Sequence, residues 1–557
     1  MRLYGTRLGS GPALVIACAL LALVVAPSAS AHAELLKTEP SNDAVVEQPP
    51  ARVSVLFNEP VESSFGGLRV YDAGANRVDS GKIERPSSRE VATAIEPRLP
   101  RGTYTVTWRI VSADGHPLSG AFVFHVEQPG ARPAGIAAEV LDDGSPPSVR
   151  VAFTTVRYLD FALLLLAAGG SIALALAFGG AEAVVRRRLS IVLAVAAGGL
   201  ALFALTGIVL QGAAAGGFGI RDALRWDVVS AVLDTRFGQV WLVQAAVAAA
   251  LAGVALARGR RGQDSLLDEV GLLLAAALIV TPASSGHAGV GGNLTFILDV
   301  VHVQAAAAWT GGLAFLVLGL LWAGRERWSL AATAVPRFST IALLAVSALL
   351  LTGVVGGYLQ VRAWRGLWET TYGLLLLTKV VLVVPLLALG AYNNRSLVGR
   401  IRASAASAKE RRRFFRTTGA ELALMAVIVG VTAVLVTEPP ARAEVAPRGP
   451  YSTFTELGAL ELNLVVDPAV AGANDVHLYV TDRSGQPTPL AEASVSARLP
   501  SRSVGPLHLH ALAAGPGHLV ARGAHLALPG DWQLTVEGRR GEFESLRQTI
   551  SVPIRKE

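Results

Sequence analysis

Eight long apolar stretches fill the middle of this 557-residue chain, and they restrict its fold more than any other feature. Each approaches the roughly 20 residues that an α-helix needs to cross the hydrocarbon core of a bilayer. Backbone groups inside lipid must be bonded within their own segment, which predicts membrane-spanning helices. The predicted spans are residues 154–178, 189–211, 238–257, 266–283, 294–322, 338–361, 372–392 and 419–437. Residues 151–437 are therefore expected to form an eight-helix transmembrane bundle.

Loop charges predict how the spans are oriented. If the first span runs inward, every inner loop is rich in arginine, including the long basic segment 395–416, whereas the outer loops hold few basic residues. This is the distribution that the positive-inside rule describes. It predicts a multi-pass protein in the lipid bilayer of the cytoplasmic membrane, with both flanking domains on the extracytoplasmic side. It also explains the net charge of +7 without a nucleic-acid partner.

Residues 1–31 have the features of a secretory signal peptide. Two arginines precede an apolar run at 12–25, and an Ala-Ser-Ala cleavage motif occupies 29–31. Cleavage there would make His32 the first residue of the mature protein. The single cysteine, Cys18, would leave with the signal peptide, so neither disulfides nor thiolate metal ligands are expected.

Alternating apolar and polar residues on both sides of the membrane domain predict β-structure. Residues 32–127 contain short strand-like runs separated by Pro, Gly, Asn and Asp, which is typical of an all-β sandwich of the Ig-like or cupredoxin-like kind. Residues 451–557 repeat this pattern and are expected to form a second small β-sandwich. The segments 128–150 and 438–450 are predicted linkers, because they are rich in proline and poor in strand-like runs.

The sequence VSADGHPLSG, at residues 111–120, places Asp114 and His116 on either side of a glycine between two strand-like runs. A carboxylate and an imidazole at such a turn can point at one ion. A mature amino terminus at His32 would add two nitrogens, from its amine and its ring, which gives a nitrogen-rich set suited to Cu(II). The other interpretation is an ordinary Asp-Gly turn beside a surface histidine, and the motif alone does not separate the two.

Four segments of this region, HAELLKTEPSNDA, FNEPV, TYTVTWRIVS and DGHPLSGAFVF, resemble the CopC family of extracytoplasmic copper-binding β-sandwiches. The resemblance covers residues 32–127 and implies a Cu(II) site made by His32, Asp114 and His116. The only methionines, Met1 and Met425, lie outside this domain. A sulfur-rich Cu(I) site is therefore not expected there.

Ionisable residues inside the spans form a second candidate site. Asp299 and His302 lie three residues apart on one helix face of the fifth span, Lys379 lies in the seventh, and His287 precedes the fifth. All are predicted in or beside the outer half of the bilayer, where charged groups are costly and commonly functional. Two interpretations are open. The residues line a copper path, or Asp299 and Lys379 form a structural ion pair while His302 donates to a backbone carbonyl.

Three segments of the membrane domain, SGHAG, HVQAAAAWTGGL and TKVVLVVPLLALGAYNNR, resemble the CopD family of copper-transport membrane proteins. The resemblance implies copper movement across the membrane, with His287 and His302 as contacts. In the last domain, LPGDWQLTV resembles YtkA-like domains. His508 and His510 there share one face of a predicted strand, and they are either metal ligands or exposed polar positions of an edge strand.

These observations favour copper acquisition and homeostasis, in which the first domain binds Cu(II) and the membrane domain transports copper, with import preferred. Copper resistance by sequestration is a second hypothesis, with the helices as an anchor. A haem-bearing redox protein is a third, although bis-histidine haem needs two facing histidines in the spans and only His302, with His287 as a candidate second, is available. Neither a Walker motif nor cysteine pairs occur, which disfavours an ATP-driven thiolate pump. The chain is not expected to be an enzyme, and the sequence identifies no protein partner.

Overall fold

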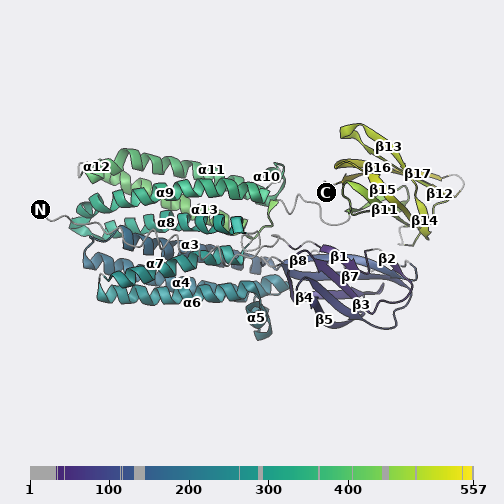
Figure 1. Ribbon diagram of the computed structural model, residues 1–557, viewed down its shortest axis with the longest axis horizontal. Helices are drawn as coiled ribbons and strands as arrows, with labels where there is room; N and C mark the ends of the chain where they lie inside the picture. Colours follow the sequence, from purple (N-terminus) through teal and green to yellow (C-terminus); the bar gives the residue numbers. More distant parts are fainter. Residues whose placement is uncertain are drawn as a thin grey trace. The chain divides into compact units, whose positions relative to one another are not determined.

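A computed structural model shows a β-domain, a helical bundle and a second β-domain along the chain (Figure 1). The structure describes residues 33, 35–42, 44–112, 115, 117–128, 130, 145–262, 264–286, 293–361, 364–403, 406–441, 451–482, 486–541 and 544–554. The predicted fold class is confirmed: β-structure flanks a bundle of long apolar helices.

The N-terminal domain is a sandwich of two four-stranded sheets, with strand orders β1-β3-β6-β5 and β2-β8-β7-β4. Its strands are β1 Leu35–Glu39, β2 Ala44–Val46, β3 Arg52–Phe57, β4 Val61–Tyr71, β5 Asp79–Ser87, β6 Glu90–Ile95, β7 Gly102–Ser112 and β8 Pro117–Val126. Apolar side chains from both sheets fill the space between them, including Phe57, Leu68, Val106 and Phe124. Burial of this apolar surface drives the two sheets together.

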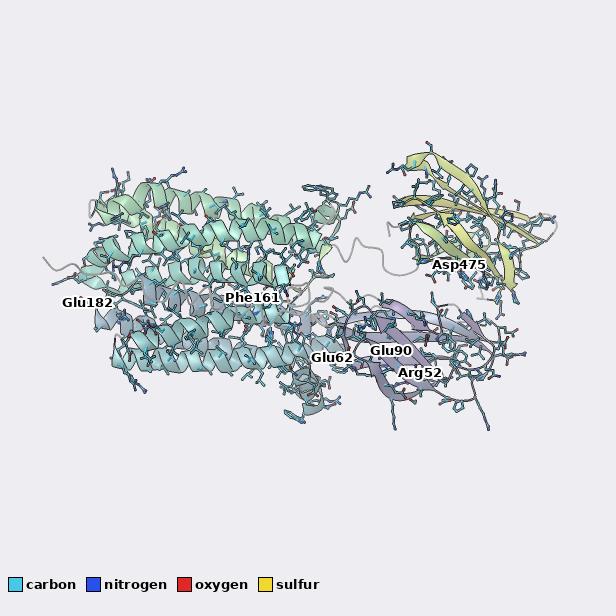
Figure 2. All side chains as sticks on the ribbon, viewed as in Figure 1. Arg52, Glu62, Glu90, Phe161, Glu182 and Asp475 are labelled. Atoms are coloured by element: carbon cyan, nitrogen blue, oxygen red, sulfur yellow. The ribbon has the colours of Figure 1, made fainter. Side chains whose placement is uncertain are left out.

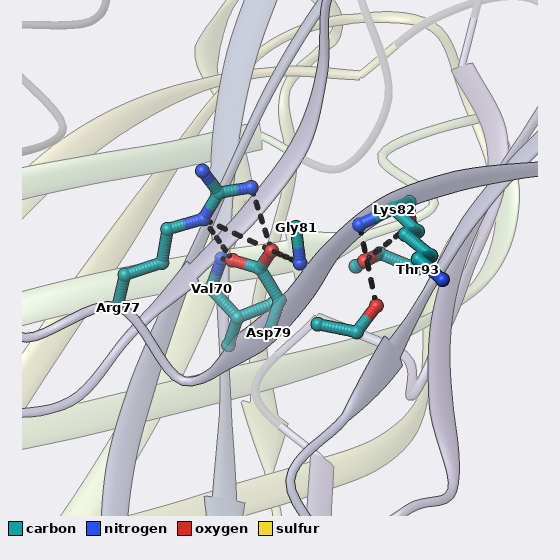
Figure 3. Close-up of polar contacts among 7 residues, drawn as sticks. Val70, Arg77, Asp79, Gly81, Lys82 and Thr93 are labelled. Carbon is teal, nitrogen blue, oxygen red and sulfur yellow. Dashed lines mark hydrogen bonds and ion pairs between the residues drawn. The ribbon is translucent and has the colours of Figure 1, made fainter.

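One buried carboxylate ties β5 to β4 in this sandwich (Figure 3). Asp79 accepts hydrogen bonds from the backbone amides of Val70 and Gly81, each at 2.9 Å, and from the Arg77 guanidinium at 2.7 Å. Burial alone would raise the pKa of Asp79, but the bonds from Arg77 and the two amides outweigh it and hold that pKa below its usual range. The carboxylate is therefore charged and fully bonded.

The described residues contain eight helices long and apolar enough to cross a membrane, as the sequence predicts (Figure 1). They are α3 Pro147–Leu176, α4 Ala183–Gly216, α6 Arg236–Arg261, α7 Ser265–Ser285, α8 Asn293–Trp322, α9 Arg327–Val361, α11 Thr371–Tyr392 and α13 Ala408–Leu435. Shorter helices include α5 Trp226–Leu233 and α10 Gly366–Glu369. The protein is a multi-pass membrane protein.

Small residues let α3 and α8 approach closely. A side chain at Gly169 would overlap the carbonyl of Ala307, and one at Gly311 would overlap the carbonyl of Leu165. Glycine at both positions allows the two backbones to touch, which favours helix association in lipid through close packing. This contact fixes α8, the helix that carries two of the predicted functional residues.

Two helix boundaries differ from the predictions. The sixth span was expected to begin at 338, but α9 begins at Arg327 and continues through Pro336. The basic segment 395–416 was expected to be a loop, but most of it is helical, with a π-helix at Asn393–Val398 and α13 beginning at Ala408. Hydropathy detects only the part of a helix that lies in lipid. The polar, arginine-rich ends continue as helix outside it, since arginine is a good helix former.

The C-terminal domain is also a sandwich, with strand orders β14-β15-β11-β10-β9 and β13-β12-β16-β17. Its strands are β9 Tyr451–Leu457, β10 Leu460–Asp467, β11 Gly472–Thr481, β12 Glu492–Leu499, β13 Val504–Leu509, β14 Leu512–Gly515, β15 His518–Leu526, β16 Gly530–Arg540 and β17 Glu544–Ile554. Trp532 is fully buried in the core between the sheets. Strands β12 and β16 alternate inward apolar and outward polar residues, as the sequence pattern predicts.

Candidate functional site

The predicted N-terminal ligands His32, Asp114 and His116 lie outside the residues that the structure describes, as does His287. Their surroundings are described in part. Strand β7 ends at Ser112 and its neighbour in the sheet, β8, begins at Pro117, so the D-x-H motif joins two adjacent strands. Ala33 packs against the core of the same sandwich. The residue after His32 is thus anchored to the domain that carries the motif.

The structure brings together the three membrane residues that it describes among the predicted set. Lys379 on α11 interacts electrostatically with both Asp299 and His302 on α8. All three side chains are half-buried within the protein. They lie six to nine residues from the starts of their helices, which places them at similar depth. The predicted convergence of an acid, an imidazole and a lysine is found between these two helices.

A hydroxyl on a third helix orients the His302 ring. The ring atom Nδ1 lies 2.9 Å from Oγ1 of Thr352 on α9. The Thr352 hydroxyl donates its own hydrogen to the carbonyl of Ala348, at 2.7 Å. In the neutral ring, Nδ1–H therefore donates to Thr352, and Nε2 carries the lone pair. A metal-binding histidine is commonly held in this way, with one ring nitrogen donating to a neighbouring group and the other nitrogen binding the metal.

This contact corrects the structural interpretation of His302. The ring was expected, in that alternative, to donate to a backbone carbonyl, but its observed partner is the Thr352 hydroxyl. The physical reason is that a hydroxyl both accepts and donates, so the Thr352 oxygen can accept the ring N–H while its own hydrogen goes to the Ala348 carbonyl. The sequence places Thr352 in the sixth span, but helix pairing is needed to see the contact.

A second polar network joins three other helices and was not predicted. Gln244 on α6 donates to Asp160 on α3 at 2.7 Å, and Thr281 on α7 donates to the Gln244 carbonyl oxygen at 2.7 Å. All three residues are buried. An acidic residue inside the first span is the sequence signal that indicates this site, because such residues are rare in membrane helices. Its amide and hydroxyl partners give no signal of their own.

A third buried acid lies beside the π-helix at the end of α11. Asn393 donates to the Glu421 carboxylate, and Thr417 donates to the Asn393 carbonyl oxygen at 2.6 Å. Glu421 lies on α13 and is 3% exposed. Turns of π-helix occur frequently at functional positions. An acidic residue inside a predicted span is again the sequence feature that indicates this site, but Glu421 was not among the predicted site residues.

Arginines at one end of the bundle share a single aspartate. Arg186 on α4 lies 3.7 Å from Asp268 on α7, and Arg258 on α6 pairs with the same carboxylate. Figure 2 labels Glu182, one turn before Arg186, at this end of the bundle. All three of these helix ends are predicted to lie on the inner side of the membrane, where the positive-inside rule favours arginine. The ion pairs with Asp268 also hold these arginine side chains in place.

The two candidate histidines of the C-terminal domain are both exposed. His508 lies on β13, the edge strand of its sheet, and His510 follows the end of that strand. Because His510 lies beyond the strand, their common face stays a prediction of the period-two spacing. Across the described parts of the chain, no group of three or more His, Cys, Asp or Glu side chains is arranged to hold a metal ion.

Family models match most of the chain. Residues 35–127 match the CopC domain, residues 147–296 match the copper resistance protein D-like N-terminal domain, and residues 331–435 match copper resistance protein D. These matches confirm the two resemblances seen in the sequence motifs.

Similar proteins agree with these matches. The copper transport protein CutJ of Bacillus subtilis (strain 168) is 32% identical over 482 residues, which cover 84% of this chain and 85% of CutJ. Inner membrane protein YebZ of Escherichia coli (strain K12) is 31% identical over 40% of this chain and 76% of its own length. The crystal structure of CopC from Methylosinus trichosporium OB3b is 29% identical and covers 18% of this chain and 95% of that one, with a TM-score of 0.16.

Proposed function

This chain belongs to the family of fused CopC and CopD copper proteins, and from that premise we propose that it binds copper outside the cytoplasmic membrane and imports it. The proposal assigns capture to the N-terminal sandwich and passage to the helical bundle. Copper is the transported substrate. The inward-negative membrane potential favours entry of a cation, so the proposal needs no nucleotide-driven step.

Capture would use the amine and ring of His32 with Asp114 and His116, holding Cu(II) in a nitrogen-rich, tetragonal set. The position of the D-x-H motif between neighbouring strands β7 and β8 supports this assignment, because it places the motif in the same domain as the residues that follow His32. The packing of Ala33 into the core supports it too, since it holds the chain end near the sandwich.

Passage would begin at Asp299 and His302, and the observation that carries the proposal is the bond from His302 to Thr352. This bond leaves the Nε2 lone pair to bind an entering ion. Asp299 supplies the opposing charge that a copper ion needs in a low-dielectric environment. When no ion is present, the positive charge of Lys379 balances the negative charge of Asp299. An entering copper ion would take the place of Lys379 as the positive partner of Asp299.

A copper uptake assay in cells tests the proposal against sequestration. Cells with the intact protein, with His302→Ala or with neither are grown at limiting copper and washed with an impermeant chelator. The matched control is Ser347→Ala, an exposed position on α9. Import predicts chelator-resistant copper that rises with the intact protein and the control but not with His302→Ala. Equal copper in all protein-bearing cells, removed by the chelator, would establish a surface store instead.

A further inference from the structure

Two histidines of the C-terminal sandwich, far apart in sequence, meet on neighbouring strands. His477 lies on β11 and His518 begins β15, and the register pairs His477 with Val520 and Tyr479 with His518. The histidines are thus diagonal neighbours on one face of the sheet. Nδ1 of His477 lies 3.2 Å from Nε2 of His518.

The two imidazole rings face each other edge to edge. Their planes differ by 17°, and their centroids are 5.4 Å apart. The distance between the ring centres is longer than the 3.2 Å between the two nitrogens by about twice the distance from a ring centre to its own nitrogen. Both nitrogens therefore lie close to the line that joins the ring centres. Because a ring nitrogen bonds along its own radius, in the ring plane, both bonding directions point at the same place between the rings.

Tyr479 holds this arrangement in position. Its ring stacks on the His518 ring with centroids 4.2 Å apart and planes 15° apart. Tyr479 and His518 are both buried, at 7% and 6% exposure. Both histidines and the tyrosine lie on paired strands of a regular sheet, where the backbone fixes the origin of each side chain. The pair is therefore oriented before any ligand binds.

We infer that His477 and His518 bind one Cu(I) ion between their facing nitrogens. The hydrogen that joins these nitrogens in the metal-free protein moves, through solvent, to the other nitrogen of the ring that donated it, so that both rings bind as neutral imidazoles. Two opposed nitrogen donors make a linear site, which suits the closed-shell Cu(I) ion, whereas Cu(II) takes a tetragonal set and Zn²⁺ takes four ligands. The inference depends on the proposed function only for the choice of copper as the metal.

The geometry requires a small adjustment when the ion enters. Metal–imidazole bonds of about 2.0 Å on both sides require nitrogens about 4 Å apart, so the rings must separate by less than about 1 Å. A rotation of the half-buried His477 side chain supplies this movement without changing the strands. His518 stays stacked on Tyr479.

The test measures Cu(I) retained by the full-length protein in detergent, without oxygen, against a colorimetric Cu(I) chelator. Every protein in the series carries His116→Ala and His302→Ala, so that the sites of the proposed function do not contribute. The parent is compared with His477→Gln, His518→Gln and the control His525→Gln, an exposed histidine on β15. The expected result is one Cu(I) per chain in the parent and control, and none in the other two.

Equal Cu(I) retention by the parent and His477→Gln would overturn the inference, and the two histidines would then form only a hydrogen bond. X-ray absorption of the loaded parent gives a second measurement that does not depend on how the variants fold. It should show two nitrogen neighbours in a linear arrangement, and three or four neighbours would contradict the site. The cell uptake assay tests only His302, whereas the Cu(I) retention assay tests only His477 and His518. A failure of the proposed function can therefore be told apart from a failure of the Cu(I) site.

Discussion

Two polar clusters of the helical bundle, one buried and one half-buried, differ in how their charged groups are hydrogen-bonded or paired. In the network of α3, α6 and α7, the amide of Gln244 bonds the Asp160 carboxylate, and the Thr281 hydroxyl bonds Gln244 in turn. In the cluster of α8, α9 and α11, an acid and a lysine accompany an imidazole whose second nitrogen bears a lone pair. The first arrangement is closed and holds helices together. The second contains groups that an entering cation can replace or bind.

The largest expected effect is at His302. His302→Ala removes the proposed ligand, and copper uptake should fall by more than the roughly 10–100-fold that loss of an orienting partner costs a metal site. Protein stability should change little, because the ring is only half-buried and Thr352 keeps its bond to Ala348 when the ring is removed. Uptake and thermal unfolding of the same detergent-purified protein measure both quantities. Normal copper uptake by His302→Ala would show that the cluster of α8, α9 and α11 has no role in transport.

Thr352→Val should weaken copper transport by about 10–100-fold, because the His302 ring loses the group that fixes its tautomer. Thr352→Ser keeps the hydroxyl and should restore transport. Concentration dependence of uptake separates weaker binding from slower turnover. If valine and serine variants transport equally well, then the hydroxyl does not orient the ring.

Asp160→Ala should lower the free energy of unfolding by about 1–3 kcal/mol while leaving copper transport intact, because the buried Gln244 amide loses its acceptor. Asp160→Asn is the matched control, since it keeps the shape and one acceptor oxygen. Thermal unfolding in detergent, read beside the uptake assay, checks both parts. A stable Asp160→Ala protein that no longer transports would reverse the roles assigned to the two clusters.

The smallest expected effect on stability is at Asp79, which lies outside the membrane. It is a fully hydrogen-bonded carboxylate with which the acids of both clusters can be compared. The Asp79 pKa is lower in the folded than in the unfolded protein, so the carboxylate stabilises the N-terminal sandwich above the ordinary aspartate pKa of about 4. This stabilisation is lost as the pH falls through the lower, folded value. Asp79→Asn should cost about 1 kcal/mol at neutral pH.

Calorimetry of the full chain from pH 7 to pH 3 measures this effect. The gap between the unfolding temperatures of the native protein and Asp79→Asn should narrow as the acid is protonated. A gap that stays constant over that range would show that the charge of Asp79 contributes nothing and that only its shape matters.

The sequence predicted those parts of the structure that depend on local pattern. Apolar length identified the eight helices that are long and apolar enough to cross a membrane in the described residues, and alternation identified both sandwiches. Depth along a helix was enough to predict that Asp299, His302 and Lys379 lie at one level of the bundle, but not that they meet. Helix ends were missed at α9 and α13, because polar residues outside lipid carry no hydropathy signal.

Contacts between distant segments could not be predicted from pattern. Thr352 and Gln244 matter only through the helices they face, and pairing of helices is set by packing across the whole bundle. His477 and His518 meet because of one strand register, and a shift of one residue would turn them to opposite faces. The sequence pointed to His508 and His510 as candidate metal ligands instead, because their spacing of two residues can be seen without knowing the strand register.

Copper flux into sealed proteoliposomes tests the central claim most directly, because it isolates the helical bundle from every other copper protein of a cell. Vesicles with the intact protein, His302→Ala or Asp160→Ala receive external copper, and the copper trapped inside is measured after the outside is chelated. The account predicts flux through the intact protein and through Asp160→Ala, but not through His302→Ala. Flux that is equal for the intact protein and His302→Ala would contradict it.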